Sequence, residues 1–235
     1  MSASAPSPDL AHIDTWVFDL DNTLYHPKHE LFTQIDAKMG AFIANMFGCD
    51  LVEARRIQKE YFHAHGTTLA GLMKDHDVKP DVFLDFVHDV VLDTLEPEPG
   101  LREALTALPG RHLIFTNADV TYAGRVLDKL GIADLFDGMF DIHAAHYVPK
   151  PADAPYAALV ETFAINPASA IFFEDMARNL IPAHRLGFTT VWIDNGSESG
   201  DRDSDPAYID YHIDDLVPFL QGITRHHPTK ESRVP

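Results

Sequence analysis

The sequence predicts an α/β fold: a doubly wound parallel sheet with a helical cap inserted after its first strand. Short apolar runs typical of buried strands recur along the chain, and runs with helical periodicity lie between the later ones. A helical stretch of about 90 residues separates the first two strand-like runs, far more than one crossover helix needs. Strand and helix therefore alternate in the core, as they do in parallel sheets with helices on both faces.

The predicted strands are five apolar runs, at residues 15–18, 112–115, 170–173, 189–193 and, more weakly, 211–213. Three of these runs end next to side chains that can contact a phosphate or a metal ion, namely Asp19, Thr116 and Asp175. Ligands of such Rossmann-like sheets bind outside the carboxyl ends of the strands, where the strand order reverses. The sequence therefore predicts a site at this edge of the sheet.

Helices with one apolar face fill the gaps after the later strands. Helical periodicity covers residues 120–130 and stops at Gly131, and it resumes over 156–163 after Pro155. Glycine is common just past the end of a helix and proline in its first turn. These helices are the expected crossovers of the sheet.

The long insertion, residues 28–97, carries three apolar stripes at helical spacing and is the predicted cap. His26-Pro27 on one side and residues 97–100, which include two prolines and a glycine, on the other predict a two-stranded hinge. We expect such a cap to exclude water and to contact the part of the substrate that does not react.

The predicted division of the chain follows from this pattern. Residues 12–27 and 98–222 form the catalytic α/β core and residues 28–97 the cap. Residues 1–11 and 225–235 are expected to be disordered tails.

Composition narrows the class of protein. The net charge of -18 disfavours nucleic acid polymers and anionic membrane surfaces, because both would repel the chain. The single cysteine, Cys49, excludes an internal disulfide, and no apolar run approaches the roughly 20 residues of a membrane helix. No secretory signal opens the chain, so we expect a cytoplasmic protein.

The first strand ends in two aspartates separated by one residue. Side chains at i and i+2 of a strand share a face, so Asp19 and Asp21 start out aimed the same way. Two carboxylates at such a short distance repel each other unless a cation or a shared proton lies between them. The pair indicates a divalent cation, a phosphate bound with it, or acid and base catalysis. A helix cap followed by a turn residue is the structural alternative.

Three further groups follow in chain order. Thr116 and Asn117 offer a hydroxyl and an amide to phosphoryl oxygens, Lys150 lies on a stiff loop between two prolines, and Glu174 precedes Asp175 at a strand end. Each has an ordinary alternative: a capping residue, a solvated lysine and an acidic turn. The order of the groups and their positions at strand ends together favour one site.

These motifs resemble the haloacid dehalogenase-like superfamily, over residues 15–219. Most of its members are magnesium-dependent phosphotransferases that work through an aspartyl-phosphate. The resemblance implies that Asp19 is the nucleophile and that Asp21 is the acid and base, with its backbone carbonyl also on the metal. Dehalogenases of the superfamily use no metal and lack the second aspartate, so Asp21 indicates a phosphatase.

The resemblance also assigns binding roles. Thr116 and Lys150 would hold the phosphate. Asp175 would ligate Mg²⁺ directly together with Asp19 and Asp21, Glu174 would support it, and Asn179 would belong to the outer shell of the metal. Magnesium prefers a few carboxylates and several waters, which fits this set.

A closer resemblance is to the pyrimidine 5'-nucleotidase group of the superfamily. It rests on residues 21–25, on the cap segment 66–72 and on residues 147–151. It implies that Thr67 and Thr68 of the cap take part in substrate recognition. The structural alternative is a helix start that one of these threonines caps.

The expected function is a magnesium-dependent phosphomonoesterase that converts pyrimidine nucleoside 5'-monophosphates to nucleoside and phosphate. Two alternatives stay open: a phosphatase of another small metabolite, such as a sugar phosphate or phosphoglycolate, and a binding module without activity on the same fold.

Overall fold

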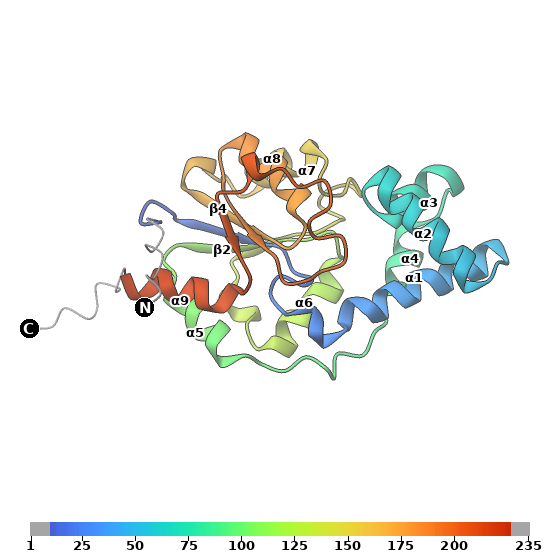
Figure 1. Ribbon diagram of the computed structural model, residues 1–235, viewed down its shortest axis with the longest axis horizontal. Coiled ribbons are helices and arrows are strands. Elements are labelled where there is room, and N and C mark those ends of the chain that lie inside the picture. The colour runs from blue at the N-terminus through green and yellow to red at the C-terminus, as the bar shows by residue number, and fades with distance from the viewer. Residues whose placement is uncertain (1–9, 227–235) are drawn as a thin grey trace, which may run out of the picture.

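The computed structural model describes residues 10–226 and contains, over that range, one parallel sheet of six strands in the order β3-β2-β1-β4-β5-β6 (Figure 1). The strands are β1 (Thr15–Phe18), β2 (Arg111–Phe115), β3 (Gly138–Phe140), β4 (Ala170–Glu174), β5 (Thr189–Ile193) and β6 (Tyr211–Ile213). The predicted fold class is confirmed. Strand β3 was not predicted, because its three residues include a glycine and two of them are only half-buried.

Helices cover both faces of the sheet (Figure 1). On one face lie α5 (Pro99–Ala107), α6 (Val120–Leu130) and α9 (Leu216–His226), and on the other lie α7 (Asp153–Thr162) and α8 (Leu180–Leu186). Successive side chains of β1 point to opposite faces of the sheet. Trp16 and Phe18 therefore pack in the apolar core on the face of α5, α6 and α9, and Val17 packs in the core on the face of α7 and α8. Helix α6 stops at Gly131, with φ of 70°, as predicted.

Short 3-10 turns connect these elements: η1 (Pro27–His29), η2 (Ala133–Leu135), η3 (Pro167–Ser169), η4 (Ala177–Asn179) and η5 (Pro206–Tyr208). The strand register pairs Phe18 with Ile114 of β2 and with Phe173 of β4. The three central strands therefore end at one edge of the sheet, where η4 begins the connection to α8.

Five α-helices lie between β1 and β2 in the described chain, and the first four of them precede α5: α1 (Leu31–Phe47), α2 (Leu51–His65), α3 (Thr68–His76) and α4 (Pro80–Val87). We call these four helices the cap; they project from one end of the sheet in Figure 1. Phe42 of α1 packs on Phe83 and Phe86 of α4, at centroid distances of 5.1 and 5.7 Å. This apolar contact ties the first and last helices together.

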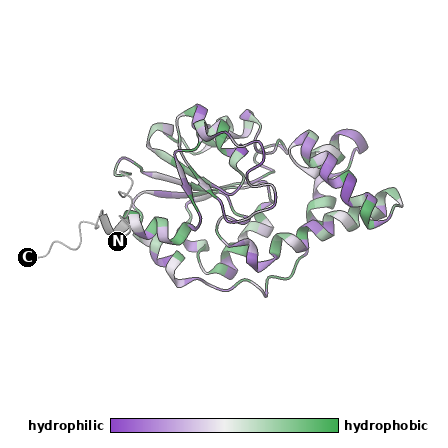
Figure 2. Cartoon of the chain, in the orientation of Figure 1, coloured by the Kyte–Doolittle hydropathy of each residue, from purple (hydrophilic) through white to green (hydrophobic). Residues whose placement is uncertain are grey.

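The exposed side of α2 carries many hydrophilic residues, although Leu51 and Val52 at its start are exposed apolar side chains. Figure 2 shows hydrophilic residues along α2, and two of them, Glu53 and Glu60, pair with Arg56 at 2.7 and 2.8 Å. Such exposed pairs stabilise a helix only slightly. The buried side of the cap is therefore what holds it in place.

The ends of the described chain differ in part from the expected tails. Leu10 is only 3% exposed and belongs to the core, because it packs in the same cluster as Ile13 and Trp16, so it is not part of a disordered tail. Helix α9 continues to His226, beyond the predicted start of the second tail. The rest of both predicted tails lies outside the described residues. None of the helices within residues 10–226 is long and apolar enough to cross a membrane.

Candidate active site

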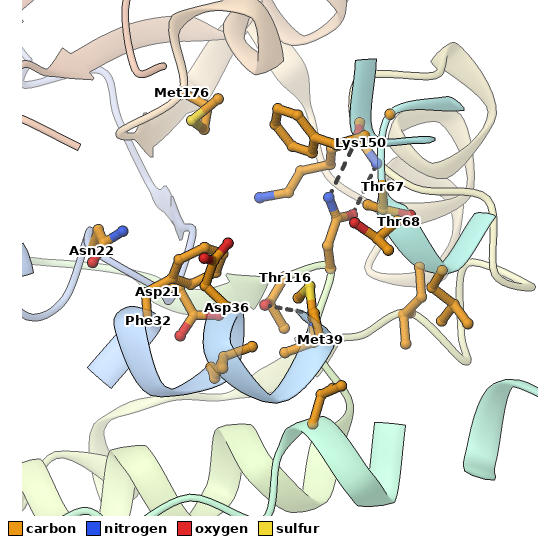
Figure 3. Close-up of a pocket in the computed structure, with 18 of the residues that line it drawn as sticks. Asp21, Asn22, Phe32, Asp36, Met39, Thr67, Thr68, Thr116, Lys150 and Met176 are labelled. Atoms are coloured by element: carbon orange, nitrogen blue, oxygen red, sulfur yellow. Dashed lines mark hydrogen bonds between the residues drawn. The ribbon is translucent and has the colours of Figure 1, made fainter. Parts of the chain in front are cut away.

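The sheet edge, the loop after β3 and the cap surround one cavity (Figure 3). Asp19 directly follows β1, Thr116 follows β2 and Asp175 follows β4. Lys150 reaches the same cavity from the loop after β3. The structure thus brings the four predicted groups together, although they are far apart in the sequence.

Lys150 is the charged centre of this cavity. It is 2% exposed, and its Nζ donates to Asp19 Oδ1 at 2.7 Å, to Glu174 Oε2 at 2.6 Å and to the Phe115 carbonyl at 2.9 Å. Burial opposes the charge on Lys150, but the two carboxylates outweigh burial and raise its pKa. Lys150 is therefore a fixed cation and not a solvated surface lysine.

Three buried carboxylates meet beside this lysine. Oxygens of Asp19, Glu174 and Asp175 lie within 4.8 Å of one another, a cluster suited to a metal ion within the described residues. Burial and then the charge of Glu174 raise the pKa of Asp19 to about 6. Burial, followed by the charges of Glu174 and Asp19, raises the pKa of Asp175 well above its usual range. A divalent cation would relieve this repulsion.

Neighbouring amides fit the same ion. Asn179 Oδ1 and Asn22 Oδ1 are buried, line the cavity and have no hydrogen-bond partner. Buried acceptors without a donor are rare and costly, so each needs a partner. Water bound to Mg²⁺ would supply donors, which suits the outer role predicted for Asn179. The oxygen-rich set fits Mg²⁺, which keeps several of its waters when bound.

Asp21 lines the cavity with two tyrosines behind it. Tyr25 Oη and Tyr122 Oη both donate to Asp21 Oδ1, at 2.5 and 2.7 Å. Burial and then the charge of Asp19 raise the pKa of Asp21, and the two tyrosine hydrogen bonds oppose them. Sequence reasoning assigned no role to either tyrosine. Tyr25 lies only four residues from Asp21, but Tyr122 lies 101 residues away, and only the fold brings it to Asp21.

The residues predicted to hold the phosphate differ in the hydrogen bonds that their side chains already make. Asn117 is engaged with the lysine loop, since its Oδ1 accepts from the Lys150 backbone N–H at 2.9 Å. Thr116 is 2% exposed, and its hydroxyl accepts from the Ala118 N–H at 3.0 Å. Thr23, which belongs to the motif of Asp19 and Asp21 but had no predicted role, donates its hydroxyl to Asp19 Oδ2 at 3.2 Å. Asn117 therefore positions the Lys150 loop in this structure.

The two cap threonines line the cavity but use their hydroxyls within the cap. Thr67 Oγ1 caps α3 by accepting from the Ala70 N–H at 3.2 Å, which is the structural alternative. Thr68 Oγ1 donates to the Gln58 carbonyl at 3.3 Å. Substrate recognition by these residues stays a prediction.

The cap contributes other cavity residues that sequence reasoning did not single out. Among them are the apolar side chains of Phe32, Met39 and Phe62 and the charged Asp36 and Lys59. Figure 3 shows Phe32, Asp36 and Met39 on the α1 side of the cavity. The apolar stripes of the cap were visible in the sequence, but which residues face the core was not.

Comparison with known proteins agrees with this geometry. Residues 13–187 match the family model of the haloacid dehalogenase-like hydrolases. "Phosphate metabolism protein 8" of Saccharomyces cerevisiae is 29% identical over 202 residues, which cover 79% of this chain and 63% of the yeast protein. The chain thus spans less than two thirds of the length of this curated relative.

Solved structures share the fold. A HAD phosphatase from Thermococcus onnurineus superposes with a TM-score of 0.60 at 20% identity, covering 90% of this chain and 97% of that one. The HAD-hydrolase YfnB from Bacillus subtilis, solved bound to magnesium, gives 0.57 at 14% identity, with 90% and 98% covered. L-2-haloacid dehalogenase from Xanthobacter autotrophicus gives 0.53 at 17%, with 91% and 97% covered. From the family match over residues 13–187, the chain belongs to the haloacid dehalogenase-like hydrolases.

Proposed function

We propose that this hydrolase is a magnesium-dependent phosphomonoesterase that forms an aspartyl-phosphate on Asp19 and acts on pyrimidine nucleoside 5'-monophosphates. The observation that carries the proposal is Asp21, which two tyrosine hydroxyls hold in the cavity that Asp19 also lines. Phosphate ester cleavage needs a proton donor for the leaving oxygen, and then a base for water. Asp21 suits both tasks.

The first step joins Asp19 to phosphorus. A carboxylate oxygen of Asp19 attacks, the bond from phosphorus to the ester oxygen breaks, and Asp21 gives its proton to the departing alkoxide. Burial raises the pKa of Asp21, which favours the protonated acid that this step requires. Lys150, 2.7 Å from Asp19, stays charged throughout and offsets part of the negative charge on the phosphoryl group.

The second step releases phosphate. Asp21, now ionised, takes a proton from water, the water oxygen bonds to phosphorus, and the bond from phosphorus to Asp19 breaks. Mg²⁺, held by Asp19, Asp175 and the Asp21 carbonyl with support from Glu174 and Asn179, would neutralise charge on the phosphoryl oxygens. Tyr25 and Tyr122 keep the Asp21 carboxyl in place through both proton transfers.

A resemblance supports the choice of a pyrimidine, and the lining of the cavity supports a nucleotide of either base class. Segments 21–25, 66–72 and 147–151 resemble the pyrimidine 5'-nucleotidases, and the cap gives the cavity aromatic side chains, Phe32 and Phe62, against which a planar base can pack. The part of the cavity that the cap lines would hold the nucleoside, and the part at the sheet edge would hold only the phosphoryl group.

Phosphate release from a substrate panel tests the proposal. Uridine, cytidine, adenosine and guanosine monophosphates, a sugar phosphate, phosphoglycolate and p-nitrophenyl phosphate are assayed with Mg²⁺ and again after chelation. We expect the highest kcat/KM for the two pyrimidine nucleotides and loss of all activity on chelation. A purine or sugar phosphate preference would contradict the substrate, and full activity after chelation would contradict the metal. No hydrolysis of any ester would favour a binding module.

A further inference from the structure

Arg178 is a buried arginine that the proposed mechanism does not use. It lies in η4, directly beyond the acidic pair of β4, is 8% exposed and lines the cavity. Its guanidinium stacks over the Phe62 ring of the cap at 4.4 Å, and one terminal nitrogen donates to the Gly66 carbonyl at 3.3 Å. Its Nε is buried without a hydrogen-bond partner.

The other cations of the cavity are already paired. Lys150 contacts Asp19 and Glu174, and Lys59 lies 3.1 Å from Glu198 and 3.5 Å from Asp36. Among the residues that the structure describes, Arg178 is the only lysine or arginine of the cavity lining with no carboxylate within 4.0 Å. A buried charge without an anionic partner is unfavourable, so an anionic oxygen beside Arg178 would be bound tightly.

The charges of the site indicate which kind of anion Arg178 can bind. The carboxylates of Asp19, Glu174 and Asp175 are balanced by Lys150 together with one divalent cation. A phosphate ester that enters as a dianion therefore adds two negative charges, which the net charge of this cluster does not balance even though Lys150 and the cation lie beside it. Arg178 supplies a cation on the same cavity, and a guanidinium presents planar N–H donors that match phosphoryl oxygens.

We propose that Arg178 is a substrate-binding residue that donates its Nε–H and a terminal N–H to oxygens of the phosphoryl group. The inference rests on the proposed phosphatase function and extends it beyond the predicted phosphate holders. The contacts with Phe62 and Gly66 hold the guanidinium at the junction of cap and core, which orients Nε before substrate arrives.

The test compares Arg178→Gln and Arg178→Lys with the matched control Arg202→Gln. Arg202 also joins the core to the cap, through His63 Nε2 at 3.0 Å, but it is not part of the cavity lining. For each variant, calorimetry with Mg²⁺ gives the Kd of inorganic phosphate, kinetics give KM and kcat for uridine monophosphate and p-nitrophenyl phosphate, and a thermal scan gives Tm.

We expect Arg178→Gln to raise the Kd of phosphate and the KM of both esters by about tenfold or more, the range of a lost charged hydrogen bond. Arg178→Lys restores part of the binding, and Arg202→Gln leaves it unchanged. A loss confined to uridine monophosphate would overturn the proposal and assign Arg178 to the leaving group. A lower Tm with unchanged phosphate binding would make it a structural contact between cap and core.

The same data separate this inference from the proposed function. Phosphate binding that depends on Arg178, in a protein that hydrolyses no ester, would refute the phosphatase proposal and leave the inference standing. Hydrolysis that proceeds with a normal phosphate Kd in Arg178→Gln would refute the inference alone.

Discussion

Asp21 accepts hydrogen bonds from Tyr25 and Tyr122 on one oxygen, Oδ1, at 2.5 and 2.7 Å. The carboxyl is thereby fixed while its other oxygen stays available to the leaving group and to water. Tyr122 is itself held by a stack on the His88 ring, at a centroid distance of 4.4 Å, and His88 bonds to Asp119. A chain of side chains from the start of α6 thus supports Asp21, the proposed acid and base.

Removing one hydroxyl of this support tests its role. Tyr122→Phe keeps the ring and its stack on His88 but loses the hydrogen bond to Asp21, so we expect kcat to fall by roughly tenfold with little change in KM. Tyr208→Phe, outside the cavity lining, is the control and should match the wild type. Steady-state kinetics with uridine monophosphate measure both. An unchanged kcat in Tyr122→Phe would show that the hydroxyl does not position Asp21.

Asp21→Asn removes the proton donor and base. We expect both formation and hydrolysis of the aspartyl-phosphate to slow by roughly 10²-fold or more, as is typical of lost proton transfer. The first step should suffer less with p-nitrophenyl phosphate, because its leaving group needs little protonation. Rapid-quench kinetics separate the two steps. Equal slowing of the first step for aryl and alkyl esters would refute the acid role.

The carboxylate cluster predicts how metal binding depends on pH. We expect Mg²⁺ to bind the folded protein at this cluster and therefore to raise Tm, and we expect Asp175→Asn to abolish that rise while the exposed Asp85→Asn retains it. Burial raises the pKa of Asp19 to about 6 in the metal-free site, so Asp19 gains a proton as pH falls through this value. The rise in Tm should therefore be present at pH 7.5 and shrink below pH 6. Thermal scans with and without Mg²⁺ that gave the same rise at pH 5 would contradict this site.

At the scale of elements, the junction between α2 and α3 is where the cap meets two core loops. Gly66, at the end of α2, has φ of 86° and its carbonyl accepts from Arg178. A Cβ added there would lie 3.4 Å from Pro149 Cγ and 3.5 Å from the Lys150 carbonyl. The loop that carries Lys150 therefore packs directly on the cap at this glycine.

Gly66→Ala and Gly48→Ala make a matched pair. Both positions have positive φ, but a Cβ at Gly48 meets nothing within 4 Å. We expect Gly48→Ala, in the left-handed helical region, to lose about 1 kcal/mol of stability from backbone strain, and Gly66→Ala, whose backbone lies outside that region, to lose more. Only Gly66→Ala should also lower kcat/KM, by severalfold, because a backbone shift that relieves strain at this residue would displace the Lys150 loop that it contacts. Equal kcat/KM in the two variants would show that this contact does not affect the site.

A second contact joins the cap to the core through charge. Arg55 and Lys59 of α2 both lie 3.1 Å from Glu198, in the loop after β5, and Ser197 beside it bonds to Asn195 at 2.9 Å. Asn195 in turn donates to the Asn22 carbonyl at 2.6 Å. The cap is thus linked to the loop behind Asp21 from this side as well.

At the scale of the whole molecule, the alternation of strands and helices was predictable because buried parallel strands are continuous apolar runs. Residues 15–18 and 189–193 were assigned correctly for this reason. Strand β3 has no such run, and Leu10 carries no local sign of burial, so both were missed. Their structure depends on contacts with distant segments.

Some residues of the candidate site could likewise be predicted from the sequence, and others could not. Asp19, Thr116, Lys150 and Asp175 could be found because each follows a strand or lies on a loop with marked local chemistry, and the structure brings them to one cavity. The support of Asp21 by Tyr122 and the unpaired Arg178 could not be found from sequence, since both depend on how the cap and α6 pack on the core. The sequence allowed the Thr67 hydroxyl either to contact substrate or to cap a helix, and in the structure it caps α3.

The most direct test of the account is the phosphatase activity of Asp19→Asn beside that of the wild type. Phosphate release from uridine monophosphate and p-nitrophenyl phosphate is measured with Mg²⁺, and Tm is measured on the same samples. An amide preserves the size of Asp19 but cannot attack phosphorus, so we expect a folded protein without turnover on either ester. A folded variant that retained more than about a tenth of the wild-type rate would contradict Asp19 as the nucleophile.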